Sequence, residues 1–331
     1  MRDSPQKASC WPALALCALL LVPGLGIAAW HGDEQAKMGT RIAVQLWHPD
    51  AEEGQRLVAA AMAEFDRIEA VMSTYREESE ISRLNRSAAD GPVPVSEELY
   101  DIVEQSIEMS RLTRGAFDIT YESVGYLYAF RDRQAPSESQ VTARLDAIDY
   151  HHLLLDPEAR SIAFAVEGVR INLGGIGKGY ACDRAVDLIR QAGVEHALVS
   201  AGGDTRLLGD RRGQPWVVGI RDPDDAEALV TRLALVDEAI STSGDYERYF
   251  EEDGLRYHHI LDPATGRPSE GVRSATVIGP DGTRTDALST SVFVMGADAG
   301  LELIERLPGY EAVVIDSSRG VRLSAGLAPP Q

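Results

Sequence analysis

The chain has 331 residues, of which 44% are hydrophobic and 25% are charged. This composition is typical of a globular protein and excludes a disordered or fibrous one. Acidic residues outnumber basic ones by 52 to 32, which gives a formal net charge of −20. Nucleic acids and anionic membranes attract clustered Lys and Arg, so neither is expected as the main partner. A phosphorylated small ligand stays compatible, because backbone amides and a metal ion can bind phosphate.

The first 28 residues have the layout of a secretory signal peptide. Arg2 and Lys7 precede an apolar run over 11–22, which small residues follow. This pattern predicts cleavage after Ala28 and an exported, periplasmic protein. The alternative is an uncleaved membrane anchor, although the run is short for a full span. The mature chain, 29–331, contains one cysteine, so no intramolecular disulfide is expected.

Strand and helix patterns are mixed along the mature chain without strict alternation. In chain order we expect a strand over 40–47, a helix over 52–72, a helical turn at 81–84, a helix capped by Ser96, a polar loop over 131–140, a hairpin of 152–155 and 161–166, a strand over 169–173, a helix ending at Gln191, strands over 196–200, 216–220, 229–236 and 274–278, helices over 285–295 and 299–307, and a hairpin of 310–316 and 321–323. This mixture favours an α+β fold. No linker divides the mature chain, so we expect a single domain.

The most conspicuous local feature is the glycine-rich segment Asn172-Leu-Gly-Gly-Ile-Gly-Lys-Gly-Tyr180. A P-loop needs glycine at 172 and Ser or Thr at 179, and the dinucleotide fingerprint needs a glycine at 180. Neither nucleotide motif is therefore present. A glycine run before a helix still offers free amides to a phosphate. A tight structural connection is an equal alternative.

Two adjacent histidines stand beside a turn, in His258-His259-Ile-Leu-Asp262. Adjacent residues of a strand point to opposite faces, so the two histidines are not expected to share a metal. One of them is a candidate base. The alternative is a structural histidine whose hydrogen bonds are satisfied inside the fold.

A carboxylate and a hydroxyl share one face of a predicted helix, because Asp286 and Thr290 are four residues apart. These are hard oxygen ligands, which suit Mg²⁺ beside phosphates. The alternative is that Asp286 caps the helix N-terminus and that the threonine is solvated.

Taken in order, eight short segments resemble the ApbE family of flavin transferases. They are Met38-Gly-Thr40, Met-Ser-Thr-Tyr75, Gly115-Ala-Phe-Asp-Ile-Thr120, Asn172-Leu-Gly-Gly-Ile-Gly-Lys-Gly-Tyr-Ala181, Ser200-Ala-Gly-Gly-Asp204, Ile240-Ser-Thr-Ser-Gly244, His259-Ile-Leu-Asp-Pro-Ala-Thr-Gly-Arg-Pro268 and Asp286-Ala-Leu-Ser-Thr290. They cover nearly the whole mature chain. The resemblance implies one domain of mixed, largely antiparallel sheets flanked by helices.

The resemblance also implies an activity. Such an enzyme uses Mg²⁺, splits FAD and joins FMN through its phosphate to a Thr or Ser of an acceptor protein, releasing AMP. Acceptors in the family are exported flavoproteins and subunits of Nqr- and Rnf-type redox complexes. Membrane contact is then expected only through the acceptor or an uncleaved signal segment.

Site residues follow from the resemblance position by position. The residues expected to line the FAD site are Met38, Tyr75, Ala116, Phe117, Asp118, Asn172, Lys178 and Ile260. Those expected to hold the metal are Gly175 through its carbonyl, Asp286 and Thr290, with Ser289 nearby. His259 would lie close to the pyrophosphate. Position 289 is often aspartate in relatives, and some relatives have an acid at 178.

Attack on a pyrophosphate requires neutralised oxygens, an aligned hydroxyl and a base. Either His259 or a nearby carboxylate could be that base. Two other functions compete, namely an FAD pyrophosphatase and a flavin carrier without catalysis. A covalent carrier should contain (Ser/Thr)-Gly-Ala-Thr, whereas the nearest stretch, Arg273-Ser-Ala-Thr276, lacks the glycine.

Overall fold

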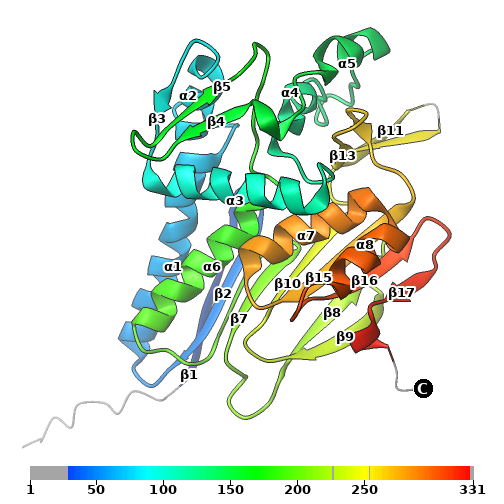
Figure 1. Ribbon diagram of the computed structural model, residues 1–331. Coiled ribbons are helices and arrows are strands. Elements are labelled where there is room, and N and C mark those ends of the chain that lie inside the picture. Colours follow the sequence, from blue (N-terminus) through cyan, green and yellow to red (C-terminus); the bar gives the residue numbers. More distant parts are fainter. Residues whose placement is uncertain (1–28, 226, 253, 329–331) are drawn as a thin grey trace, which may run out of the picture.

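A computed structural model describes residues 29–225, 227–252 and 254–328 (Figure 1). The predicted signal peptide, 1–28, lies outside the described residues. The principal sheet has the strand order β1 (Ala29–Lys37), β2 (Thr40–His48), β6 (Ala197–Ala201), β7 (Asp204–Leu208), β10 (Ala239–Gly244), β15 (Val272–Gly279), β16 (Glu311–Asp316) and β17 (Val321–Leu323). Every neighbouring pair in it is antiparallel.

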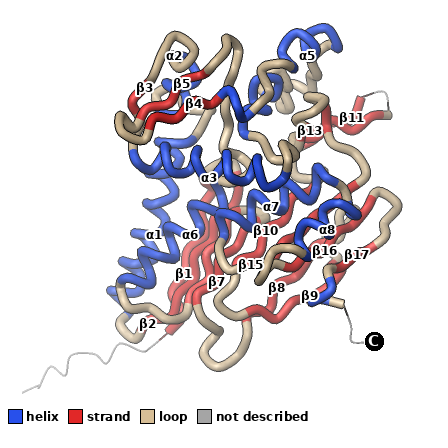
Figure 2. Tube along the Cα trace, viewed as in Figure 1, coloured by secondary structure: helices blue, strands red, loops and turns tan. Residues whose placement is uncertain are grey.

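Four helices cover one face of this sheet, as Figure 2 shows. They are α1 (Ala51–Met72), α6 (Gly177–Gln191), α7 (Gly282–Met295) and α8 (Ala297–Glu305). α1 packs on β1 and β2, α6 on β6 and β7, and α7 on β10 and β15. Alternation along β2 buries Ile42, Val44 and Leu46, and the helical spacing of α1 buries Phe65 and Ile68 against them.

The remaining elements form smaller units around this core. The helices are α2 (Glu80–Ser87), α3 (Glu97–Thr113), α4 (Glu122–Gly125), α5 (Glu138–Leu145), and the short 3₁₀ turns η1 (Ile119–Tyr121), η2 (Tyr150–His152) and η3 (Ala325–Leu327). The sheets are β3 (Val93–Pro94) with β5 (Ser161–Phe164) and β4 (Leu153–Asp156), β8 (Trp216–Arg221) with β9 (Leu229–Leu235), β11 (Tyr249–Glu252) with β12 (Leu255–His258), and β13 (Leu261–Asp262) with β14 (Arg267–Pro268). Within the described ranges, no helix has the length and apolarity needed to cross a membrane. The predicted α+β fold with largely antiparallel sheets flanked by helices is confirmed.

Two of the predicted elements are wrong. The segment 169–173 joins no sheet. A side chain takes the place of a neighbouring strand: the amide of Ile171 donates to Oδ1 of Asn85 (2.8 Å), and its carbonyl accepts from Nδ2 of Asn85 (2.9 Å). The polar loop predicted over 131–140 ends at Ser137, which forms a capping box with Gln140 and starts α5 there.

Most other predicted elements agree with the structure, with small shifts at their ends. α3 has the predicted N-cap Ser96, and β4 and β5 form the predicted hairpin. α7 starts three residues earlier than predicted, and α2 is longer than the predicted turn. β1, β7 and β10 carry no clear apolar alternation, so the sequence did not predict them.

Candidate active site

The first turn of α6 meets α7 at the centre of the candidate site. The amide of Gly179 donates to Oδ2 of Asp286 at 2.9 Å. A Cβ atom at Gly179 would overlap the carbonyl oxygen of Gly282, so a side chain here would force the helices apart. Asp286 is 2% exposed. It does not cap its own helix, because the N-cap of α7 is Asp281, so that alternative is wrong.

Lys178 lies between two buried carboxylates. Its Nζ is 2.6 Å from Oδ2 of Asp204, at the start of β7, and 3.7 Å from Oδ1 of Asp286. Burial alone would lower the pKa of Lys178, but the two carboxylates outweigh burial and raise it above its usual value. Burial and then the Asp204 charge raise the pKa of Asp286, which Lys178 partly offsets. Two carboxylates share one cation, so a second cation is electrostatically favoured here.

Hydroxyl groups surround the other side of Asp286. Ser243 of β10 places its Oγ 2.9 Å from Ser289 Oγ and 3.2 Å from Thr290 Oγ1. Ser289 Oγ also donates to the carbonyl of Asp286 (2.9 Å). A Cβ atom at Gly175 would lie 3.1 Å from Thr290 Oγ1, so the glycine-rich turn runs directly beside this threonine. The structure therefore brings together the four residues expected to hold a metal.

The donor set of these residues fits Mg²⁺. It offers a carboxylate, a backbone carbonyl and hydroxyl groups, which are hard oxygen ligands. Within the described ranges, no group of three or more His, Cys, Asp or Glu side chains could hold a metal ion. Mg²⁺ is commonly held by one or two carboxylates together with water and substrate phosphates, which is the kind of site that Asp286 provides.

His259 follows β12 and differs from its neighbour. His258 is bonded through Nε2 to the carbonyl of Ser269 (2.8 Å), so it is a satisfied structural histidine. Nδ1 of His259 is buried without a hydrogen-bond partner among the described residues. Burial, followed by the charges of Arg248, His258 and Lys178, lowers the pKa of His259 to about 3. His259 is therefore neutral near pH 7 and has a ring nitrogen available to a ligand.

Asn172 joins the glycine-rich turn to a buried acid that the sequence did not indicate. Its Oδ1 accepts from the amide of Gly174 (2.8 Å), and its Nδ2 donates to Oε2 of Glu122 (3.0 Å). Burial raises the pKa of Glu122 to about 7, against the effects of Asn172 and Arg170. Nothing in the neighbouring sequence marks this glutamate, because only its burial beside Asn172 makes it unusual.

The other residues expected at the FAD site lie around this centre. Phe117 is buried, and its Cε2 lies 3.3 Å from the Cβ position of Gly175. Asp118 accepts from the amide and hydroxyl of Thr120 and from the amide of Tyr150, so its carboxylate is fully engaged inside the chain. Ala116, which precedes Phe117, is half-buried.

The last three expected FAD-site residues are Met38, Tyr75 and Ile260, and none of them forms a described hydrogen bond with Asp286 or Thr290. Met38 occupies the β1–β2 turn at a φ of 51° and packs partly against the core. Tyr75 is 77% exposed, and Ile260 is buried next to His259. The neighbouring turn residue Gly39 lies under Arg248, whose Nη2 would be 2.8 Å from a Cβ there. Arg248 forms no ion pair within the described ranges.

The comparisons with known proteins identify the family of this chain. A sequence model of the ApbE family matches residues 38–314. An FAD:protein FMN transferase of Klebsiella pneumoniae is 31% identical over 292 residues, covering 87% of this chain and 90% of that protein. One of Vibrio cholerae is 33% identical over 301 residues, covering 88% and 90%. The crystal structure of the ApbE protein from Thermotoga maritima has a TM-score of 0.85 and 33% identity, covering 90% of this chain and 98% of that one. The flavin transferase ApbE from Vibrio cholerae has a TM-score of 0.79 and 29% identity, covering 89% and 96%.

An antiparallel α+β fold, shared over most of the chain with relatives named FAD:protein FMN transferase, defines a transferase. The chain belongs to the ApbE family.

Proposed function

We propose that this protein transfers FMN from FAD to a Thr or Ser hydroxyl of an acceptor protein, using Mg²⁺ and releasing AMP. The observation that carries the proposal is the convergence of Gly175, Asp286 and Thr290 at the N-terminus of α6. Relatives that share this fold over most of their length are named FAD:protein FMN transferase.

The reaction exchanges one P–O bond for another. The acceptor hydroxyl oxygen bonds to the phosphorus of the FMN half, the bond to the bridging oxygen breaks, and AMP leaves with that oxygen. When bound at Gly175, Asp286 and Thr290, Mg²⁺ neutralises the pyrophosphate charge. The chain itself adds the Lys178 ammonium and the positive end of the α6 dipole to the same region.

His259 takes the hydroxyl proton in this proposal. A pKa of about 3 makes it a weak base in the substrate-free protein. A pyrophosphate nearby would favour the protonated imidazole and raise that pKa toward the working pH. Its Nδ1 has no hydrogen-bond partner among the described residues, so it can accept a proton without breaking an existing bond.

We also propose that the protein works in the periplasm after removal of residues 1–28. The basic and apolar pattern of this segment supports export. Acceptors would then be exported or membrane-bound redox proteins, with Nqr- and Rnf-type subunits as the first candidates. Intact-mass analysis of the exported protein tests the cleavage, and a retained Met1 contradicts it.

The function is tested by incubation with FAD, Mg²⁺ and an Nqr-type acceptor subunit. We expect a flavin-fluorescent acceptor band after denaturation and one AMP per flavin transferred. The matched control is the same acceptor with its modified hydroxyl residue replaced by alanine, which should remain dark. Free FMN and AMP with no labelled acceptor would instead indicate an FAD pyrophosphatase. FAD binding without AMP release would indicate a non-catalytic flavin-binding protein.

A further inference from the structure

α6 and α7 carry the same pair of residues at their contact. Each has a glycine followed four residues later by an aspartate, Gly179 and Asp183 on α6 and Gly282 and Asp286 on α7. Each aspartate accepts the amide of the other helix's glycine. Gly179 donates to Asp286 at 2.9 Å, and Gly282 donates to Asp183 at 2.8 Å. We call these two hydrogen bonds the reciprocal clamp.

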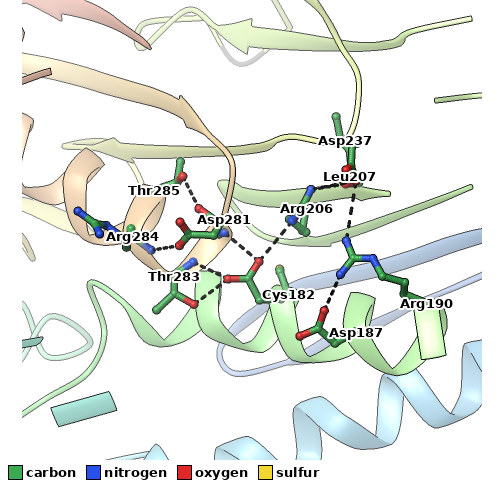
Figure 3. A network of polar contacts seen from close by, with 12 residues as sticks. Cys182, Asp187, Arg190, Arg206, Leu207, Asp237, Asp281, Thr283, Arg284 and Thr285 are labelled. Atoms are coloured by element: carbon green, nitrogen blue, oxygen red, sulfur yellow. Dashed lines mark hydrogen bonds and ion pairs between the residues drawn. The ribbon is translucent and has the colours of Figure 1, made fainter. Parts of the chain in front are cut away.

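The two aspartates of the clamp differ in what else they bind. Asp183 also accepts from the amide and the hydroxyl of Thr283, both at 2.7 Å, and lies 3.5 Å from Nε of Arg206. In Figure 3, dashed lines from Thr283 and from Arg206 end at one unlabelled carboxylate, which these contacts identify as that of Asp183, and Asp281 lies beside Thr283. Protein donors therefore occupy both oxygens of Asp183, whereas among the described side chains Oδ1 of Asp286 has only the longer contact with Lys178.

The two glycines bring α6 and α7 so close together that neither helix can shift without moving the other. A Cβ atom at Gly282 would lie 2.8 Å from the carbonyl of Gly179 and 3.0 Å from Oδ1 of Asp183. A Cβ atom at Gly179 would lie 2.7 Å from the Cβ of Asp286. Because the helices touch through backbone here, a shift at one end of the clamp moves the other end.

We propose that Asp183 is a positioning residue, which holds α7 against α6 so that the Asp286 carboxylate stays beside the N-terminus of α6. Asp183 touches neither metal nor substrate. It acts by fixing the orientation of a ligand, as hydrogen-bonding partners of metal ligands do. The metal part rests on the proposed function, whereas the clamp itself does not.

The test compares a variant of Asp183 on α6 with a variant of Asp281, the N-cap of α7. Asp183→Asn is isosteric, but its amide group would face the N–H donors of Gly282 and Thr283. Asp281→Ala removes the N-cap bond from the Arg284 amide (2.8 Å) and the bond from the Tyr310 hydroxyl (2.8 Å). Neither bond involves Asp183, so this variant is the matched control. The first readout is amide hydrogen exchange of ¹⁵N-glycine-labelled protein at Gly179 and Gly282. The second is the Mg²⁺ concentration that half-saturates FAD binding, followed by flavin fluorescence.

Asp183→Asn should speed exchange at both glycines and raise the half-saturating Mg²⁺ concentration by about 10–100-fold. Asp281→Ala should lower the melting temperature yet leave Gly179 exchange and the Mg²⁺ requirement unchanged. Unchanged Gly179 exchange in Asp183→Asn overturns the clamp, and faster exchange with an unchanged Mg²⁺ requirement overturns the positioning role.

Thr283→Val serves if Asp183→Asn does not fold, because it removes one bond to Asp183 and keeps the others. It should shift the same two readouts in the same direction by a smaller amount, and no shift in either contradicts the proposal. If the wild-type protein binds no FAD with Mg²⁺, the proposed function fails, and the exchange measurement still decides on the clamp.

Discussion

Lys178 forms its shorter ion pair with Asp204, at 2.6 Å between Nζ and Oδ2. Its distance to Oδ1 of Asp286 is 3.7 Å. Asp204 is therefore the nearer partner of the Lys178 ammonium. Lys178 interacts less strongly with Oδ1 of Asp286 and leaves that oxygen available to a metal ion. Asp204 lies on β7, whereas Lys178 and Asp286 lie on α6 and α7. Its ion pair with Lys178 should therefore influence how strongly the site binds a metal ion.

Asp204→Asn should weaken metal binding and folding together. Without the Asp204 charge, Lys178 is drawn to Asp286 and competes with Mg²⁺ for it. The half-buried Lys178 ammonium also loses its nearer partner, which should lower the free energy of unfolding by about 1–3 kcal/mol. Urea unfolding and a Mg²⁺ titration on the same sample measure both effects.

The control is Asp66→Asn, which breaks a Lys–Asp pair with Lys37 whose carboxylate is exposed, whereas that of Asp204 is buried. It should change the free energy of unfolding by less than about 1 kcal/mol. Equal losses in the free energy of unfolding in the two variants, or an unchanged Mg²⁺ affinity in Asp204→Asn, would contradict the proposed role of the Asp204–Lys178 ion pair.

His259→Ala should slow flavin transfer by about 10²–10⁴-fold and leave FAD binding nearly unchanged, because a general base acts on the rate. Single-turnover rates at saturating FAD and acceptor measure this effect. His258→Ala is the control: it should lower the melting temperature, since it loses the bond to Ser269, with a smaller effect on the rate. Near-normal turnover in His259→Ala would show that another group takes the proton.

Glu122→Gln should stabilise the protein in alkaline solution. Burial raises the pKa of Glu122 to about 7, so the folded state retains a proton that the unfolded state releases near pH 4.5. The free energy of unfolding therefore falls as pH rises from about 4.5 to 7, and the deficit persists above pH 7. Glutamine removes the deficit, which amounts to at most about 3 kcal/mol at pH 8, and still accepts the bond from Asn172.

Urea unfolding at pH 5 and pH 8 checks this prediction. The wild-type protein and Glu122→Gln should be similar at pH 5 and differ at pH 8. The exposed Glu302→Gln should show the same small difference at both values. A loss of stability in Glu122→Gln that is equal at pH 5 and pH 8 would contradict the pKa assignment.

Local patterns predicted the elements whose residues face one apolar core. The alternation of Ile42, Val44 and Leu46 marked β2, and Ser96 marked the start of α3. β7 and β10 contain Asp, Ser, Thr and Gly, and lie within the sheet through pairing with strands distant in sequence. Such pairing leaves no local signal.

In the candidate site too, the sequence predicted features that depend on neighbouring residues and missed those that depend on contacts between distant segments. The spacing of Asp286 and Thr290 correctly predicted a shared helix face, and the glycine-rich segment correctly predicted a helix after it. Glu122 and Ser243 were not identified, because a buried carboxyl and a hydroxyl on a strand acquire their roles from neighbours brought in by the fold.

The metal site is tested most directly by the Mg²⁺ dependence of flavin transfer in Asp286→Asn. Asparagine can still accept the Gly179 amide, so the helix contact persists while the charge is lost. Thr290→Val should be milder, because water can replace a neutral hydroxyl ligand. Circular dichroism and the melting temperature of each sample establish that it is folded.

The measurement is the initial rate of covalent flavin incorporation as Mg²⁺ is titrated into folded wild-type protein and folded Asp286→Asn. Loss of the carboxylate should leave the phosphate charge poorly neutralised in the transition state and cost about 10²–10³-fold in rate or more. We predict a saturable Mg²⁺ dependence in the wild-type protein and no Mg²⁺-dependent transfer in the variant. An unchanged Mg²⁺ dependence with a lowered melting temperature would contradict the metal site.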